Sequence, residues 1–102
     1  MTGPADYQRV FKKARRLSST GFTILIRPND YDYPRLGLIV SKKCARKAVQ
    51  RNIIKRQVRE SFRQQRAHLS NVDIVVMAKP SLTGKSNQDI RSLLVKHWAE
   101  MR

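Results

Sequence analysis

The order of apolar and polar positions divides the chain into short helices and strands. Over residues 6–16 apolar side chains recur every three or four positions, which predicts a helix that ends before a Ser-Ser-Thr-Gly run. Two apolar runs, 22–26 and 36–40, predict strands that pair as a hairpin across a loop at 28–34. Residues 73–78 predict a third strand, apolar enough to be buried on both faces.

Two further helices are predicted after the second strand. The first extends over about residues 48–66, and its apolar row at steps of four (Ile54, Val58, Phe62) is expected to face the sheet. The second begins after Ser86, which is typical of an N-cap, and carries an amphipathic stripe. The resulting order, α-β-β-α-β-α, indicates a single domain of the α+β class.

The long central helix carries a row of cations beside its apolar row. At 100° per residue the centres of the two faces lie about 100° apart, so the helix can pack on a sheet and still display the cations. Glu60 is the one acidic residue in this segment, although a helix tuned for stability would intersperse acids. We call the following set the cationic band: Arg51, Lys55, Arg59 and Arg63, widened by Asn52, Arg56 and Arg66.

The composition of the chain supports a binding role for this band. The 102 residues carry 22 lysines and arginines against 7 aspartates and glutamates, a formal net charge of +15, which favours a polyanionic partner. Electrostatics alone does not separate RNA from DNA or an anionic membrane, because phosphate contacts carry no sequence information. A solvated helix face without a ligand is the other interpretation of such a charge run.

Few residues indicate catalysis or metal binding. The sequence has no glycine-rich phosphate loop or paired catalytic carboxylates, and His68 and His97 are too few for a histidine metal site. Trp98 is expected to anchor the core. Cys44 is the single cysteine, which excludes an internal disulfide and suits a reducing compartment. Without an apolar run long enough for a membrane span or a signal peptide, we expect a cytoplasmic protein.

Five segments, taken in order along the chain, form a specific sequence pattern. They are residues 6–12 (DYQRVFK), 35–43 (RLGLIVSKK), 48–56 (AVQRNIIKR), 59–63 (RESFR) and 73–79 (DIVVMAK). Together these segments resemble the bacterial ribonuclease P protein subunit, over nearly the whole chain and far more specifically than one basic helix. The chain departs from the Arg-Asn-Arg core of that family at Ile53, where the second arginine is missing.

The resemblance implies a mixed sheet with a left-handed β-α-β crossover through the long helix, as in the second domain of a small-subunit ribosomal protein and against the usual handedness rule. It also implies two RNA-facing surfaces. The central helix would dock on a catalytic RNA subunit through Arg51, Asn52, Lys55, Arg56, Arg59 and Arg63. A cleft between the first helix, the central helix and the sheet would take the single-stranded 5′ leader of precursor tRNA, through Tyr7, Phe11, Ser41, Lys42, Arg46 and Lys79.

By the same resemblance, the protein assists the endonuclease that matures the 5′ end of tRNA. The RNA subunit would hold Mg²⁺ and perform the hydrolysis, while the protein would be non-catalytic, without a cofactor, membrane or obligate protein partner. Tyr7 and Phe11 are suited to stack on unpaired bases, although core packing is the other interpretation of Phe11. A ribosomal RNA-binding protein, a non-specific duplex DNA binder and a protein-only nuclease are the alternatives.

Overall fold

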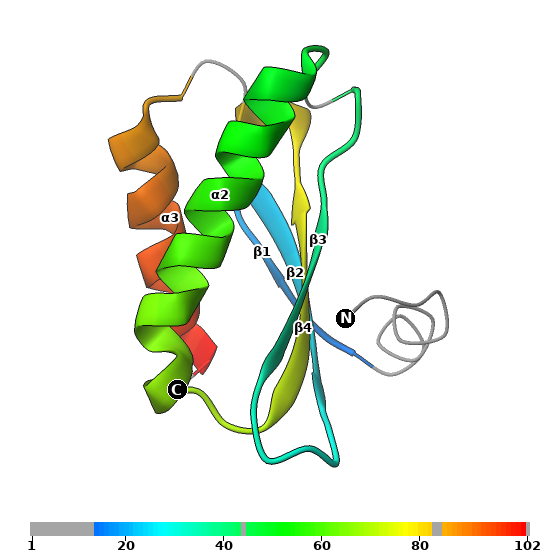
Figure 1. Cartoon of the computed structure of the whole chain (residues 1–102), viewed down its shortest axis with the longest axis vertical. Coiled ribbons are helices and arrows are strands. Elements are labelled where there is room, and N and C mark those ends of the chain that lie inside the picture. Colours follow the sequence, from blue (N-terminus) through cyan, green and yellow to red (C-terminus); the bar gives the residue numbers. More distant parts are fainter. Residues whose placement is uncertain (1–13, 44, 83–84, 102) are drawn as a thin grey trace.

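The computed structural model describes residues 14–43, 45–82 and 85–101, so most of the predicted first helix lies outside the described residues. The strands are β1 (Arg15–Ser18), β2 (Phe22–Pro28), β3 (Arg35–Ile39) and β4 (Val72–Ala78). The helices are α2 (Ala48–Gln65) and α3 (Asn87–Met101), with 3-10 turns η1 (Arg66–His68) and η2 (Pro80–Leu82). Figure 1 shows α2 and α3 on the same side of the sheet.

The strand order is β1-β2-β4-β3, which corrects the predicted hairpin between β2 and β3. β4 lies between these two strands, antiparallel to β2 and parallel to β3. Residues 72–76 of β4 are all buried, and a strand without a solvent-facing side is most stable in the interior of a sheet. The apolar run that predicted burial on both faces therefore also explains why β4 separates β2 from β3.

Residues 15–18 form a strand that the sequence pattern did not predict. β1 pairs antiparallel with β2, so that Leu17 lies opposite Ile24 and packs against the core. Ser19 closes the connecting turn, because its N–H donates to the Phe22 carbonyl at 2.9 Å and its Oγ accepts from the Phe22 N–H at 3.2 Å. The predicted first helix is therefore wrong at its C-terminal end, where pairing with β2 outweighs the local helical period.

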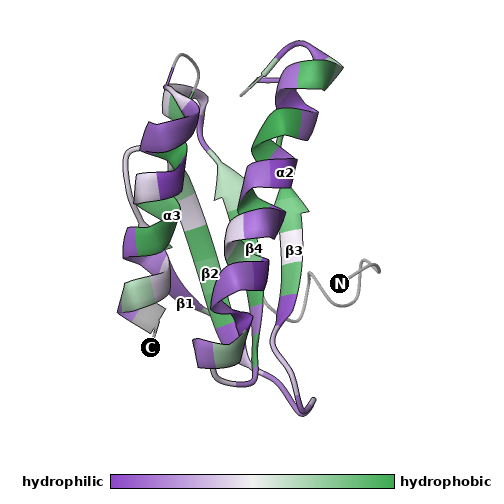
Figure 2. Cartoon of the chain, turned by 60° about the vertical axis from the view of Figure 1, so that its left-hand side comes forward, coloured by the Kyte–Doolittle hydropathy of each residue, from purple (hydrophilic) through white to green (hydrophobic). Residues whose placement is uncertain are grey.

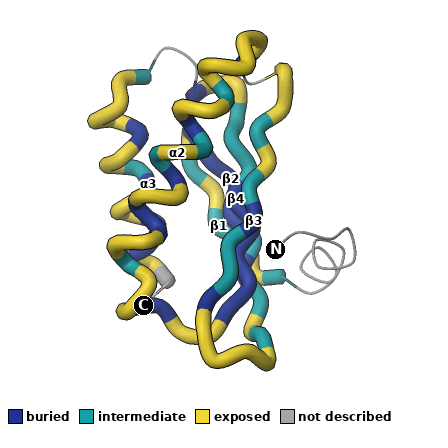
Figure 3. Tube along the Cα trace, viewed as in Figure 1, coloured by how far each residue is buried: buried dark blue, intermediate teal, exposed yellow. Residues whose placement is uncertain are grey.

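The core lies between the sheet and the two helices, where Figure 3 shows the buried segments facing one another. Phe22 and Ile24 of β2 and Ile74 of β4 are fully buried there. Trp98 of α3 is also fully buried, as predicted, and its indole N–H donates to Ser61 Oγ of α2 at 2.7 Å. This hydrogen bond satisfies two buried polar groups and joins the two helices.

The predicted boundaries of α2 and α3 agree closely with the structure. α2 ends at Gln65, one residue before its predicted end. α3 begins after Ser86, whose Oγ accepts a hydrogen bond from the Asp89 N–H at 3.1 Å, as expected of an N-cap. The residue before α2, Lys47, has no side-chain cap hydrogen bond, so the first turn of α2 depends on other contacts.

β3, α2 and β4 form a left-handed crossover, as the resemblance implied. The two strands are parallel, and α2 connects them along the chain. In Figure 2 the helices lie in front of the sheet, both strands point upward and β4 lies to the left of β3. A right-handed connection, which is the rule in such units, would place β4 on the other side of β3.

Candidate nucleic-acid interface

α2 separates its apolar row from the cationic band as its period predicts. Ile54, Val58 and Phe62 are buried in the core. Arg56 and Arg59 are exposed, and neither forms a hydrogen bond or ion pair with a described residue. Exposed guanidinium groups without acidic partners are available to an external anion, and each can donate two parallel hydrogen bonds to a phosphate.

Arg51 differs from the rest of the band. Its Nη1 donates to the backbone carbonyls of Ala45 and Arg46, both at 2.9 Å. These bonds tie the connection after β3 to the first turn of α2, where the N-cap has no side-chain hydrogen bond. The remaining donors of the guanidinium group are on Nε and Nη2. A phosphate contact by Arg51 stays a prediction, but the structure gives this residue a positioning role that the charge pattern did not indicate.

Arg63 is the band residue that is paired with an acid. Its Nη2 lies 2.9 Å from Glu60 Oε2, one helical turn away on the same helix. Both side chains are largely exposed, and a solvated pair of this kind contributes little to stability. Asn52 is exposed and Lys55 is half-buried, so both lie within reach of a ligand on the band.

The predicted leader-binding residues are only partly brought together. Tyr7 and Phe11 lie outside the described residues. Ser41 is exposed in the connection after β3, and its carbonyl accepts from the Ala45 N–H at 3.2 Å. Lys42 and Arg46 lie in the same connection, and both are exposed.

Lys79 lies at the same end of the sheet, because Ile39 of β3 is opposite Met77 of β4. Its ammonium group, however, donates to Ser18 Oγ at 2.7 Å and to the Ser19 carbonyl, beside β1. Since β1 and β3 are the two edges of the sheet, Lys79 is directed away from Lys42.

The opposite end of β4 carries a buried ion pair that the sequence analysis did not find. Asp73 is buried, and it accepts from Arg35 Nε at 2.8 Å, Arg35 Nη2 at 2.7 Å and Asn29 Nδ2 at 2.9 Å. Burial raises the pKa of the Asp73 carboxyl, but the hydrogen bonds from Arg35 and Asn29 and the charge of Arg35 lower it further, so the net pKa is below its usual value. An acid within a buried strand is the signal that could have indicated this pair.

Two exposed tyrosines lie beside this ion pair in the β2–β3 loop. Tyr31 and Tyr33 are 40% and 43% exposed, with ring centroids 5.6 Å apart. The guanidinium carbon of Arg35 lies 4.1 Å from the Tyr31 ring centroid, and that of Arg66 lies 5.7 Å from the Tyr33 ring centroid. These cation–π contacts place the last residue of the cationic band against the loop.

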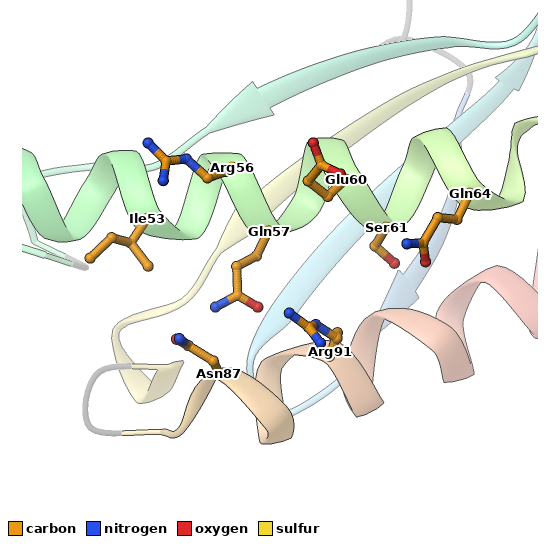
Figure 4. A pocket seen from close by; sticks show the side chains of 8 residues that line it. All are labelled: Ile53, Arg56, Gln57, Glu60, Ser61, Gln64, Asn87 and Arg91. Carbon is orange, nitrogen blue, oxygen red and sulfur yellow. The ribbon is translucent and has the colours of Figure 1, made fainter.

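A groove separates α2 from α3 on the outer surface of the helices. Figure 4 shows side chains from both helices pointing into it, with Gln57 above and Asn87 and Arg91 below. Its volume is about 420 Å³. The lining residues are Ile53, Arg56, Gln57, Glu60, Ser61, Gln64, Asn87 and Arg91.

Neither a metal site nor a membrane-spanning helix is found among the described residues. Within residues 14–43, 45–82 and 85–101, no group of three or more histidine, cysteine or acidic side chains is placed to hold a metal ion. Neither α2 nor α3 is long and apolar enough to cross a membrane.

Comparison with known proteins shows that the chain is similar to one family. The Ribonuclease P family model matches residues 1–102. A ribonuclease P protein component from Thioalkalivibrio sulfidiphilus is 55% identical over 101 residues, which cover 99% of this chain and 84% of the relative. A second, from Aliivibrio fischeri, is 52% identical over 95 residues, covering 93% of this chain and 81% of the relative.

Solved structures show the same similarity. The RNase P protein of Staphylococcus aureus superimposes with a TM-score of 0.90 at 33% identity, covering 98% of this chain and 91% of that one. The RNase P protein of Thermotoga maritima, solved with 1-(4-fluorophenyl)-2-thiourea, also gives a TM-score of 0.90, at 31% identity and with 100% and 99% coverage. The fold described above is therefore shared along nearly the full length of these chains.

Proposed function

Because the chain belongs to the family of bacterial ribonuclease P protein components, which serve with an RNA subunit in the 5′ maturation of tRNA, we propose that its cationic band is the surface that binds that RNA. This proposal is carried by Arg56 and Arg59. Both are exposed on α2, and neither has an acidic partner among the described residues. Lys55, Asn52 and Arg63 extend the same surface.

The connection after β3 is proposed to face the 5′ leader of precursor tRNA. Its exposed residues Ser41, Lys42 and Arg46 adjoin the start of α2, so a strand bound there would run beside the RNA-binding band. Cationic grooves with aromatic platforms hold single strands, and Tyr7 and Phe11 remain the proposed platform. Lys79 is proposed to act at the β1 side of this end of the sheet, where Ser18 and Ser19 orient its ammonium group.

The chemistry of cleavage is proposed to reside in the RNA subunit. Mg²⁺ held there would activate water and stabilise charge on the attacked phosphate. The contribution of the protein is to lower repulsion between RNA phosphates, for which a net charge of +15 is suited. We propose that residues 1–102 act as one RNA-binding domain, in the cytoplasm.

Reconstitution tests this function directly. The protein is combined with the ribonuclease P RNA and a precursor tRNA at a Mg²⁺ concentration too low for the RNA alone. Restored 5′ cleavage is the expected result. Cleavage by the protein without RNA, or no gain in cleavage when the protein is added, would contradict the proposal.

The leader assignment has its own test in the same assay. Phe11→Ala should reduce the preference for precursor tRNA with a leader over mature tRNA by about tenfold, because base stacking on an aromatic ring contributes about 1–3 kcal/mol. Binding of mature tRNA serves as the internal control. Equal losses for both RNAs would instead assign Phe11 to the core.

A further inference from the structure

The groove between α2 and α3 has polar groups that the proposed function does not use. It lies on the outer side of the two helices, and it shares Arg56 with the cationic band. Gln57, Asn87 and Arg91 converge in it from both helices (Figure 4). A site here would therefore be continuous with the RNA-binding surface, although it uses a second helix that the motif analysis did not connect to RNA.

Gln57 provides the first argument that the groove binds a ligand. Its Oε1 atom is buried, yet it accepts no hydrogen bond from any described residue. Buried acceptors are nearly always paired, so an unpaired one in the wall of a groove calls for a donor from outside the chain. A ligand group that carries an N–H or O–H would satisfy this acceptor.

Arg91 provides the second argument. This residue is exposed on α3 and, like Arg56, it is not engaged in a hydrogen bond or ion pair with the described part of the chain. Glu60 on the opposite wall is hydrogen-bonded by Arg63 at 2.9 Å, and its charge disfavours a continuous phosphate backbone along the groove. One phosphate beside Arg91 is compatible with both facts.

The size and lining of the groove fit one nucleotide. A volume of about 420 Å³ is within the usual range of small-ligand sites, roughly 300–1,000 Å³. Ile53, which is 44% exposed and stands where the family pattern has arginine, offers an apolar surface for the face of a base. Side-chain amides such as those of Gln57 and Asn87 pair with the N6 and N7 edge of adenine, whose exocyclic amine is a donor.

We propose that this groove binds one unpaired adenosine of the ribonuclease P RNA. Gln57 Oε1 accepts a hydrogen bond from the exocyclic amine, the Asn87 amide contacts the same base, and Arg91 holds the adjoining phosphate. Proteins commonly recognise RNA through such unstacked bases, because the paired helix hides its base edges. This inference rests on the proposed function, since the cationic band must dock on the same RNA.

The first experiment measures binding of the ribonuclease P RNA to three full-length variants at fixed Mg²⁺ and salt. Arg91→Ala should weaken binding by about tenfold, while Lys96→Ala, which removes the same charge from an exposed position of α3, should change it less than twofold. Gln57→Leu should also weaken binding about tenfold, without lowering the melting temperature of the free protein. The proposal would be overturned if Arg91→Ala and Lys96→Ala weakened RNA binding equally. It would also be overturned if the loss of binding in Gln57→Leu were explained by unfolding of that variant.

The second experiment identifies the nucleotide. RNA transcripts in which purine riboside replaces adenosine at random positions lack single exocyclic amines, and bound and free fractions are compared. One unpaired adenosine should interfere with binding of the original protein and should lose that interference with Gln57→Leu. Interference at no unpaired adenosine, or interference that persists in Gln57→Leu, overturns the groove assignment.

The proposed function is judged separately in the same assay. If Lys55→Ala/Arg59→Ala, which changes two band residues that do not line the groove, still weakens RNA binding while the groove tests fail, the band is the interface and the groove is not part of it. If the original protein does not bind the RNA at all, both proposals fail.

Discussion

Arg35 and Arg59 place the same guanidinium group in different surroundings. Arg35 is 12% exposed, donates twice to the buried Asp73 carboxylate and lies over the Tyr31 ring. Arg59 is exposed on α2 and forms no ion pair with an acid within the part of the chain that the structure describes. The first arginine holds the β2–β3 loop to β4, whereas the second leaves its charge available to RNA. Net charge alone does not distinguish these roles, but the placement of acids does.

Removal of the buried carboxylate should have the largest effect in this comparison. Asp73→Ala removes the buried carboxylate that accepts hydrogen bonds from Arg35 and Asn29, and loss of one member of a buried ion pair typically costs about 3–5 kcal/mol. Urea denaturation of the free protein measures this loss. Asp30→Ala, a change of an exposed loop carboxylate, is the control and should stay within about 0.5 kcal/mol. A loss below about 1 kcal/mol for Asp73→Ala would show that the pair does not hold the loop.

Removal of the exposed arginines should affect RNA binding and leave stability unchanged. Arg56→Ala/Arg59→Ala should weaken binding of the ribonuclease P RNA by about 2 kcal/mol, roughly 30-fold. The slope of log affinity against log salt should fall by about 0.7–0.9 for each lost phosphate contact. Arg15→Ala/Lys96→Ala removes the same charge at exposed positions outside the band and is the matched control. An equal loss of affinity in the control variant would show that the effect comes from total charge and not from the cationic band.

Arg51 should behave partly like Arg35. Arg51→Ala removes two hydrogen bonds to the Ala45 and Arg46 carbonyls, so we expect a stability loss of about 1.5 kcal/mol. Affinity for the RNA should fall because the start of α2 is less fixed, while the salt slope should change less than in Arg56→Ala. If Arg51→Ala lowered the slope of log affinity against log salt by the amount expected for one phosphate contact and left stability in urea unchanged, Arg51 would instead contact a phosphate directly.

The smallest effect is expected at His97, which is buried and whose ring centroid lies 6.5 Å from that of Phe22. Burial lowers the pKa of His97, Lys96 and Lys79 lower it further, and Glu100, 3.9 Å away, opposes this shift. The unfolded chain then takes up a proton before the folded chain does, so stability should fall as the pH drops through the unfolded pKa of about 6.5.

Thermal unfolding between pH 7.5 and 5.5 measures this dependence. The exposed His68 provides the control, since His68→Gln should retain the decrease and His97→Leu should lack it. The same decrease in His97→Leu would assign the pH dependence to another group.

Local patterns predicted α2, β4 and α3 because each is long or strongly apolar. The period of Ile54, Val58 and Phe62 fixes which face of α2 is buried, and Ser86 fixes where α3 begins. β1 was missed because its four residues have only one apolar member, Leu17, and gain their stability from pairing with β2. The predicted β2–β3 hairpin was wrong because it assumed that strands adjacent in the sequence pair with each other. β4, which lies more than thirty residues later in the chain, is inserted between them.

The candidate site was predictable as a charged helix, but its individual contacts were not. Arg51 and Arg59 occupy equivalent positions in the i,i+4 row, yet one is bonded to backbone carbonyls and the other is exposed. The backbone path before α2 decides this difference, and residue types do not encode it locally. Gln57 and Arg91 became linked only when α3 was placed beside α2.

The position of β4 between β2 and β3 also constrains how the protein is made. A nascent chain synthesised only as far as residue 71 contains β2 and β3 but lacks β4. Both strands pair with β4, so they are not yet joined in one sheet. Such contacts between distant segments slow folding. The helix proposed to bind RNA is therefore synthesised before β4, the strand that completes the sheet on which it packs.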